Sequence, residues 1–167
     1  MPERALIELL YGRGAHANTR ACVEDVPFDV AGRLADGFPH SIWQLVSHMN
    51  FWMAYELKRI GKQQPPYPTH ASDSWPTHAQ PVSNRDWQQA VGRFCALLAE
   101  LEQLAGSGTD TLVQEVSPTH PDHTKHASTV TAVLWQTLVH NSYHTGQIAM
   151  LRRVFGAWPP EGGGDTW

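Results

Sequence analysis

The sequence predicts an all-α protein, a four-helix bundle with long crossover connections. Apolar residues recur at three-and-four spacing in four segments, polar stretches rich in proline and glycine separate them, and no segment between them alternates like a strand. Each segment is roughly 20 residues long, which suits helices packed side by side around one core. Two connections are also about 20 residues long, and such lengths favour crossovers over short turns.

The first two helices are expected within the first 61 residues. One should span residues 2–23, because Pro2 suits a first helical turn and leucines follow it at helical spacing. Residues 26–39 contain two prolines and two glycines, so they should form a connection. The second helix should begin after Ser41, a good N-cap, and end at Gly61.

Residues 62–82 hold five prolines and are expected to form an extended crossover. The third helix should follow Ser83, which with Asp86 resembles a shortened capping box, and should end near Gly106.

The next connection is expected over the polar residues 107–127. Ser128 or Thr129 can then cap a fourth helix that stops at Gly156. The remaining tail is rich in proline and glycine and should be irregular.

The length and composition predict one cytoplasmic domain over residues 1–167. No apolar run approaches the ~20 residues that cross a bilayer, and charged residues interrupt the first ten positions, so neither a membrane span nor a signal peptide is expected. Cys22 and Cys95 form no CxxC pair, which favours buried thiols in a reducing compartment. The net charge is −4 without a basic cluster, so we expect no nucleic-acid partner.

Histidine is unusually frequent, with ten copies, and three of them are candidate metal ligands. His140 and His144 lie four residues apart in the fourth helix, so both imidazoles project from one face. On its own, such a pair is more often two hydrogen-bonded core histidines. His48 offers a third ligand, because it lies on an apolar helix face where an unpartnered imidazole is costly.

Three neutral imidazoles suit a divalent transition metal. Zn²⁺ and Ni²⁺ fit best and Fe²⁺ or Mn²⁺ remain options, each with positions left for water or substrate. Neither cysteine is well placed to be a fourth ligand.

The residues around these histidines resemble a known family. The segment from His40 to Trp52, HSIWQLVSHMNFW, together with HNSYHTGQI from His140, resembles the DinB/YfiT-like family of metal-dependent helical-bundle proteins. The resemblance continues through LRR at residues 151–153 to WPP at residues 158–160, and covers the rest of the chain mainly by layout. It implies a four-helix bundle, often dimeric, in which His48, His140 and His144 bind the metal. The seven tryptophans, many for one modest core, also favour a homodimer.

The resemblance also implies a function. Several relatives are transferases or isomerases that depend on a low-molecular-weight thiol, such as bacillithiol or mycothiol. In these enzymes the thiol is activated at the metal. We therefore expect a metal-dependent S-transferase that uses a thiol cosubstrate and acts on a small electrophilic molecule. A hydrolase that uses metal-bound hydroxide, and a stress-related metal-binding protein without catalysis, are the alternatives.

Further residues near the three histidines have two interpretations each. Tyr143, Gln147 and Asn50 can orient an imidazole or simply pack in the bundle, and Gly146 is expected to permit close helix approach.

Two other groups of residues are weighed in the same way. His120, His123 and His126 form a second cluster, which the nearby prolines favour as a solvated loop; Arg152 and Arg153 can receive an acidic substrate group, but better suit the helix C-terminus.

Overall fold

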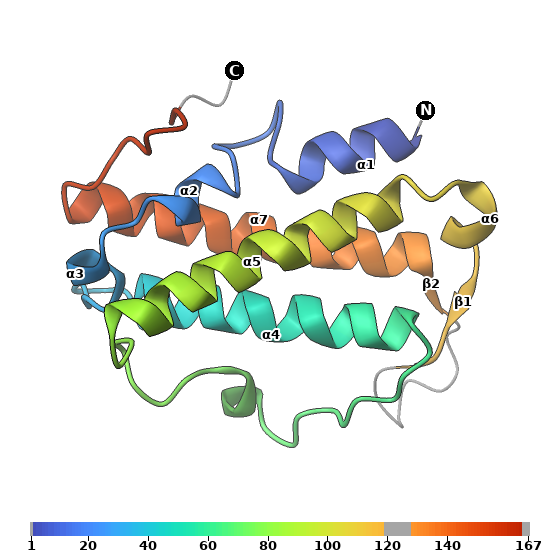
Figure 1. Cartoon of the computed structure of the whole chain (residues 1–167), viewed down its shortest axis with the longest axis horizontal. Coiled ribbons are helices and arrows are strands. Elements are labelled where there is room, and N and C mark those ends of the chain that lie inside the picture. Colours follow the sequence, from blue (N-terminus) through green and yellow to red (C-terminus); the bar gives the residue numbers. More distant parts are fainter. Residues whose placement is uncertain (1, 119–127, 165–167) are drawn as a thin grey trace.

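Four helices run lengthwise side by side in the computed structural model, which describes residues 2–118 and 128–164. These helices are α1 (Pro2–Leu10), α4 (Ile42–Ile60), α5 (Asn84–Ala105) and α7 (Val130–Val154) (Figure 1). Both α1 and α4 contact α5 and α7, so α1 and α4 lie on opposite sides of that pair. The expected all-α four-helix bundle is confirmed.

The directions of the helices explain the crossover. Helices α4 and α5 run the same way, while α1 and α7 run the opposite way (Figure 1). Residues 62–83 must therefore return along the length of the bundle, and they do so beside α4, with a short 3-10 helix, η1 (Ala71–Ser74), on the way. The crossover expected at residues 62–82 is confirmed.

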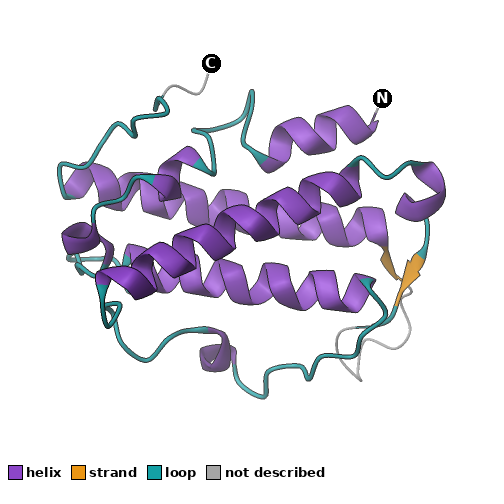
Figure 2. Ribbon diagram, viewed as in Figure 1, coloured by secondary structure: helices purple, strands orange, loops and turns teal. Residues whose placement is uncertain are grey.

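The connection from α5 to α7 lies, in its described part, at one end of the bundle, where α5 ends and α7 begins, so the second crossover expected from its length was a wrong prediction (Figure 1). It contains α6 (Thr109–Leu112) and a two-stranded antiparallel pair, β1 (Glu115–Val116) and β2 (Ser128–Thr129) (Figure 2). In this pair Glu115 lies opposite Thr129 and Val116 opposite Ser128. Strands of two residues are too short to produce an alternating pattern, so the sequence did not predict them.

The first helix is much shorter than expected. It ends at Leu10, because Gly12 and Gly14 adopt the left-handed backbone, with φ of 79° and 75°, which interrupts a right-handed helix. Two short helices, α2 (Ala21–Glu24) and α3 (Phe28–Ala31), follow instead. Residues 2–23 as one helix, and residues 26–39 as a purely irregular connection, were thus wrong predictions.

The other helix boundaries agree with the sequence. Ser41 and Gln44 form a capping box at the start of α4, the Ser83 hydroxyl accepts from the Asp86 backbone at α5, and Thr129 caps α7. The core lies between α1, α4, α5 and α7, together with α2 and α3. Large buried side chains come from each of the four bundle helices, among them Leu6, Leu10, Leu45, Met49, Met53, Trp87, Phe94, Leu98, Leu101, Leu134, Ile148 and Leu151.

Two expectations about the environment of the chain can be compared with the structure. In the described part of the chain, each helix is too short or too polar to cross a membrane. Cys22 and Cys95 are free thiols; Cys22 is buried, which raises its pKa to about 11.

Candidate metal centre

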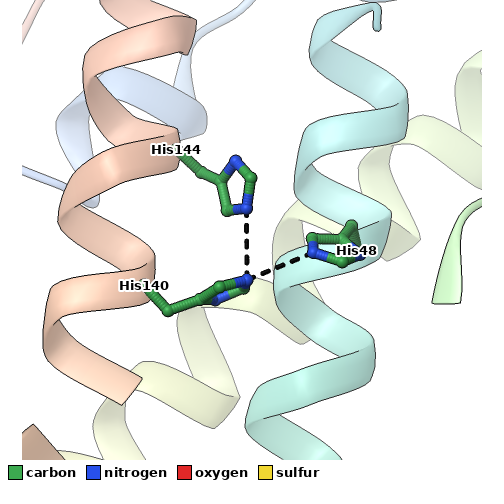
Figure 3. Close-up of side chains that lie close together, drawn as sticks. All are labelled: His48, His140 and His144. Carbon is green, nitrogen blue, oxygen red and sulfur yellow. Dashed lines mark hydrogen bonds between the residues drawn. The ribbon is translucent and has the colours of Figure 1, made fainter. Parts of the chain in front are cut away.

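Three histidines from two neighbouring helices point at one another (Figure 3). His48 lies on α4, and His140 and His144 lie one turn apart on α7. The Nε2 atom of His140 is 3.1 Å from Nε2 of His48 and 3.1 Å from Nε2 of His144. All three candidate ligand atoms lie within 4.8 Å of one another. The convergence expected from the sequence and the resemblance is therefore present.

The hydrogen-bond partners of Nδ1 in His48 and His144 determine which ring nitrogen of each histidine carries the proton. Nδ1 of His48 lies 3.4 Å from the carbonyl oxygen of Ser74, and Nδ1 of His144 lies 2.7 Å from Oε1 of Gln147. Both partners accept hydrogen bonds, so each Nδ1 carries the proton and donates it. The Nε2 atoms of His48 and His144 are then bare and present their lone pairs to His140.

This arrangement fits a cation. Nε2 of His140 faces two lone pairs at 3.1 Å but can donate at most one hydrogen, so at least one close nitrogen pair has no proton between its atoms. A transition-metal ion with nitrogen ligands at about 2.0–2.1 Å holds neighbouring nitrogens about 2.9–3.4 Å apart, which includes the observed spacing. The group thus has the donor set and geometry of a metal-binding site.

Burial keeps these imidazoles neutral. Desolvation, followed by the nearby His140 and His144, lowers the pKa of His48 to about 3, and desolvation followed by His144 lowers the pKa of His140 to about 4. Burial also lowers the pKa of His144. Since a metal ligand must be unprotonated, all three rings are ready to coordinate at neutral pH.

An aromatic stack supports His48, and the sequence did not predict it. The ring of Trp75, just after η1, lies parallel to the His48 imidazole, with centroids 3.7 Å apart and planes 9° apart. His40 stacks on the same indole at 3.8 Å and 12°. Trp75 lies in the proline-rich crossover, where helical spacing carries no information, so the one available signal was an isolated tryptophan in a polar stretch.

The residues predicted to lie near the three histidines differ in what they contact. Gln147 orients His144 directly, while Tyr143 is 65 % exposed and contacts the site through its ring, 5.0 Å from that of His144. Asn50 instead donates to the Ala90 carbonyl of α5, so an orienting role was wrong. Gly146 is exposed and a side chain there meets nothing within 4 Å, so its expected role in helix approach within the bundle was also wrong.

The arginines near the end of α7 both contact other parts of the protein. Arg152 is 2 % exposed and pairs with Asp25 at 2.6 Å, and it also donates to the backbone carbonyl of Ala157. Arg153 lies over the ring of Trp158, 3.8 Å from its centroid.

The second histidine cluster cannot be placed. His120, His123 and His126 lie outside the described residues.

Comparison with known proteins supports the family resemblance. The family model of the DinB superfamily matches residues 13–148, a range that includes all three histidines. Neither a curated protein nor a solved structure matches the chain.

Proposed function

Since the chain belongs to the DinB superfamily, we propose that it is a divalent-metal-dependent enzyme that transfers a low-molecular-weight thiol to a small electrophile. The observation that carries the proposal is the convergence of His48, His140 and His144, with two bare nitrogens facing a third. Three nitrogen donors suit Zn²⁺ or Ni²⁺ best, with Fe²⁺ or Mn²⁺ as alternatives, and leave further positions open.

The chemistry of the surroundings favours a thiol over water as the attacking group. The main charge effects on the pKa values of the three histidines come from other histidines, and no described carboxylate is among them. Among the described residues, the group of possible ligands consists of the three histidines and includes no carboxylate. A bound cation favours the ionised form of a nucleophile, and a thiol of pKa about 8.5 needs far less help than water at about 15.7.

The protein's own residues hold the site in place. Gln147 and the Ser74 carbonyl fix the ring orientations of His144 and His48, and burial keeps the rings unprotonated. The free thiols of Cys22 and Cys95 suit the reducing cytoplasm, where we place the protein.

A turnover assay tests the proposal. The purified protein is stripped with a chelator, reloaded with Zn²⁺, Ni²⁺, Fe²⁺ or Mn²⁺ in turn, and supplied with a panel of cellular thiols and a chromogenic electrophile. We expect thiol-dependent turnover that disappears on chelation and returns with one metal. Cleavage of a chromogenic ester without any thiol would instead identify a hydrolase. Stoichiometric metal without turnover of either kind would identify a non-catalytic metal-binding protein.

We also propose that the protein is a homodimer that pairs through the outer face of α7. Large apolar side chains are exposed along this face at spacings of four and seven residues, namely Trp135, Val139, Tyr143, Met150 and Val154. Gly146 is exposed in the same helix and adds no bulk there, so a second helix can approach closely. A second copy of the chain presents the same apolar face and can cover it by two-fold symmetry.

A further inference from the structure

The crossover segment of residues 74–79 is attached to the face of α4 that carries His48. The Ser41 hydroxyl donates to the carbonyl of Ala79, and the Gln44 side-chain amide donates to the carbonyl of Pro76 at 3.2 Å. Ser41, Gln44 and His48 are three and four residues apart, so they lie along one face of the helix.

The third contact in this row is made by a candidate metal ligand. Nδ1 of His48 donates to the carbonyl of Ser74, at the end of η1. The segment thus runs antiparallel to α4, with Ala79 near the start of the helix and Ser74 at His48. This hydrogen bond keeps the proton on Nδ1 of His48 and so leaves Nε2 free to bind a metal. The same bond also helps to hold the crossover against α4.

Trp75 restricts the orientation of the His48 ring, which a single hydrogen bond does not do. A hydrogen bond at Nδ1 leaves the imidazole free to rotate about the bond axis, whereas a parallel indole at 3.7 Å sets the plane of the ring. His40, which precedes the N-cap of α4, covers the opposite face of the indole. Trp75 is thus enclosed between two imidazoles and cannot tilt without losing one of the two stacks.

We propose that residues 74–79 form a clamp for the metal centre, in which Trp75 is a positioning residue that sets the plane of His48, so that metal binding and docking of the crossover on α4 are coupled. The inference rests on the proposed metal site, but it concerns a segment that contributes no ligand. The coupling is reciprocal: a metal bound to His48 favours the docked clamp as much as the docked clamp favours metal binding.

Two substitutions of Trp75 test the positioning role. Trp75→Leu removes the flat surface, and we expect it to weaken Zn²⁺ and Co²⁺ binding about 10- to 100-fold, the range for residues that orient a ligand. Trp75→Phe keeps a flat ring and should restore affinity to within about threefold of the unchanged protein. Trp158→Leu is the matched control, since Trp158 contacts Arg153 at the end of α7 and should leave affinity unchanged.

The measurements are competition with a chromogenic chelator, the visible absorption spectrum of the Co²⁺-loaded protein and circular dichroism. We expect Trp75→Leu to change the Co²⁺ spectrum, which reports ligand geometry, while its helicity stays the same. A Trp75→Leu protein with unchanged affinity and spectrum would overturn the clamp. A metal-free result for the unchanged protein would instead overturn the proposed function, so the two failures are distinguishable.

Amide hydrogen exchange on the unchanged protein tests the coupling even if Trp75→Leu does not fold. Zn²⁺ should slow exchange in residues 70–80 relative to the metal-free protein, and His140→Ala should abolish that protection. If Zn²⁺ binds and slows exchange in α4 and α7 but leaves residues 70–80 unchanged, the crossover is not coupled to the metal centre.

Discussion

Two buried polar clusters lie on α7 and differ in how their polar groups are satisfied. At Arg152, the guanidinium donates to the carboxylate of Asp25 and to the backbone carbonyls of Cys22 and Ala157. At the three histidines, the inner nitrogens face one another with too few protons to pair them. The first cluster is satisfied by the protein's own groups, whereas the second leaves at least one nitrogen lone pair without a partner among the three rings. Hydrogen-bond accounting thus distinguishes a structural cluster from a binding site on the same helix.

The two clusters also differ in the effect of burial on charge. Burial is the largest influence on the pKa of Asp25 and raises it, but the hydrogen bonds from Arg152 and the Glu161 backbone and the charge of Arg152 together outweigh burial, and the pKa ends below its usual value. At the histidines no opposite charge compensates, and burial drives the rings to the neutral form. Asp25 therefore keeps its charge beside Arg152, whereas the histidines are neutral at the place where a cation is expected.

The largest effect should follow from removing one candidate ligand. His140→Ala or His144→Ala should abolish stoichiometric metal binding, a loss well beyond the roughly 100-fold expected of an orienting residue. Helicity should persist, because the four apolar helices stabilise the bundle without the ion. Metal analysis beside circular dichroism measures both. His16→Ala is the control, since His16 contacts Ser142, which is not one of the three candidate ligands. Retained stoichiometric metal in either variant would exclude that residue as an essential ligand.

The opposite pattern is expected at the other cluster. Arg152→Met should lower the free energy of unfolding by about 3 kcal/mol, because it removes the donor to Oδ1 of Asp25 and to buried backbone carbonyls. Metal affinity should remain unchanged. Urea unfolding is the measurement, and Arg153→Met, which loses the contact to Trp158 and a hydrogen bond to the Ala149 carbonyl at the surface, should cost under about 1 kcal/mol. Equal losses of unfolding free energy in the two variants would mean that the Arg152 cluster stabilises the fold no more than the surface contacts of Arg153 do.

Acid should destabilise the metal-free protein through the histidines first. The pKa values of His48 and His140 are about 3 and about 4 in the folded protein, below the unfolded value of about 6.5. The unfolded chain therefore binds more protons once the pH falls below about 6.5, and stability is lost from there down to the folded values. We expect a loss of about 2 kcal/mol between about pH 7 and pH 5.5.

Urea midpoints at the two pH values measure this loss, and His140→Leu should reduce it. The same pH dependence in both proteins would contradict the assignment. The lowered pKa of Asp25 costs stability only once the pH falls through the usual carboxyl pKa of about 3.9, so acid acts on the histidine cluster first.

The smallest change in stability is expected on the outer face of α7, beside the histidine cluster. Val139→Asp alters an exposed side chain, so it should change the free energy of unfolding by no more than about 0.5 kcal/mol. It should nevertheless convert the proposed homodimer to a monomer, because a carboxylate would be buried at the interface. Light scattering at micromolar concentration measures the state of both proteins. An unchanged protein that is already monomeric would exclude the dimer.

The sequence by itself determined the features that depend on neighbours along the chain. Ser41, Ser83 and Thr129 mark helix starts because an N-cap acts on backbone groups two or three residues away. The pairing of His140 with His144 follows in the same way from the helical repeat. That His48 joins them was implied by the family resemblance, since spacing says nothing about a residue 92 positions away.

Only the tertiary structure decided which distant segments complete each cluster. Ser74 and Trp75 reach His48 because the crossover returns along α4, and Asp25 reaches Arg152 across 127 positions because the segment after α2 packs against the end of α7. In neither case does local spacing encode the contact. Such contacts depend on how whole helices pack and on the path that the connections then take, which is why the sequence indicated the three histidines and Gln147 but not Ser74, Trp75 or Asp25.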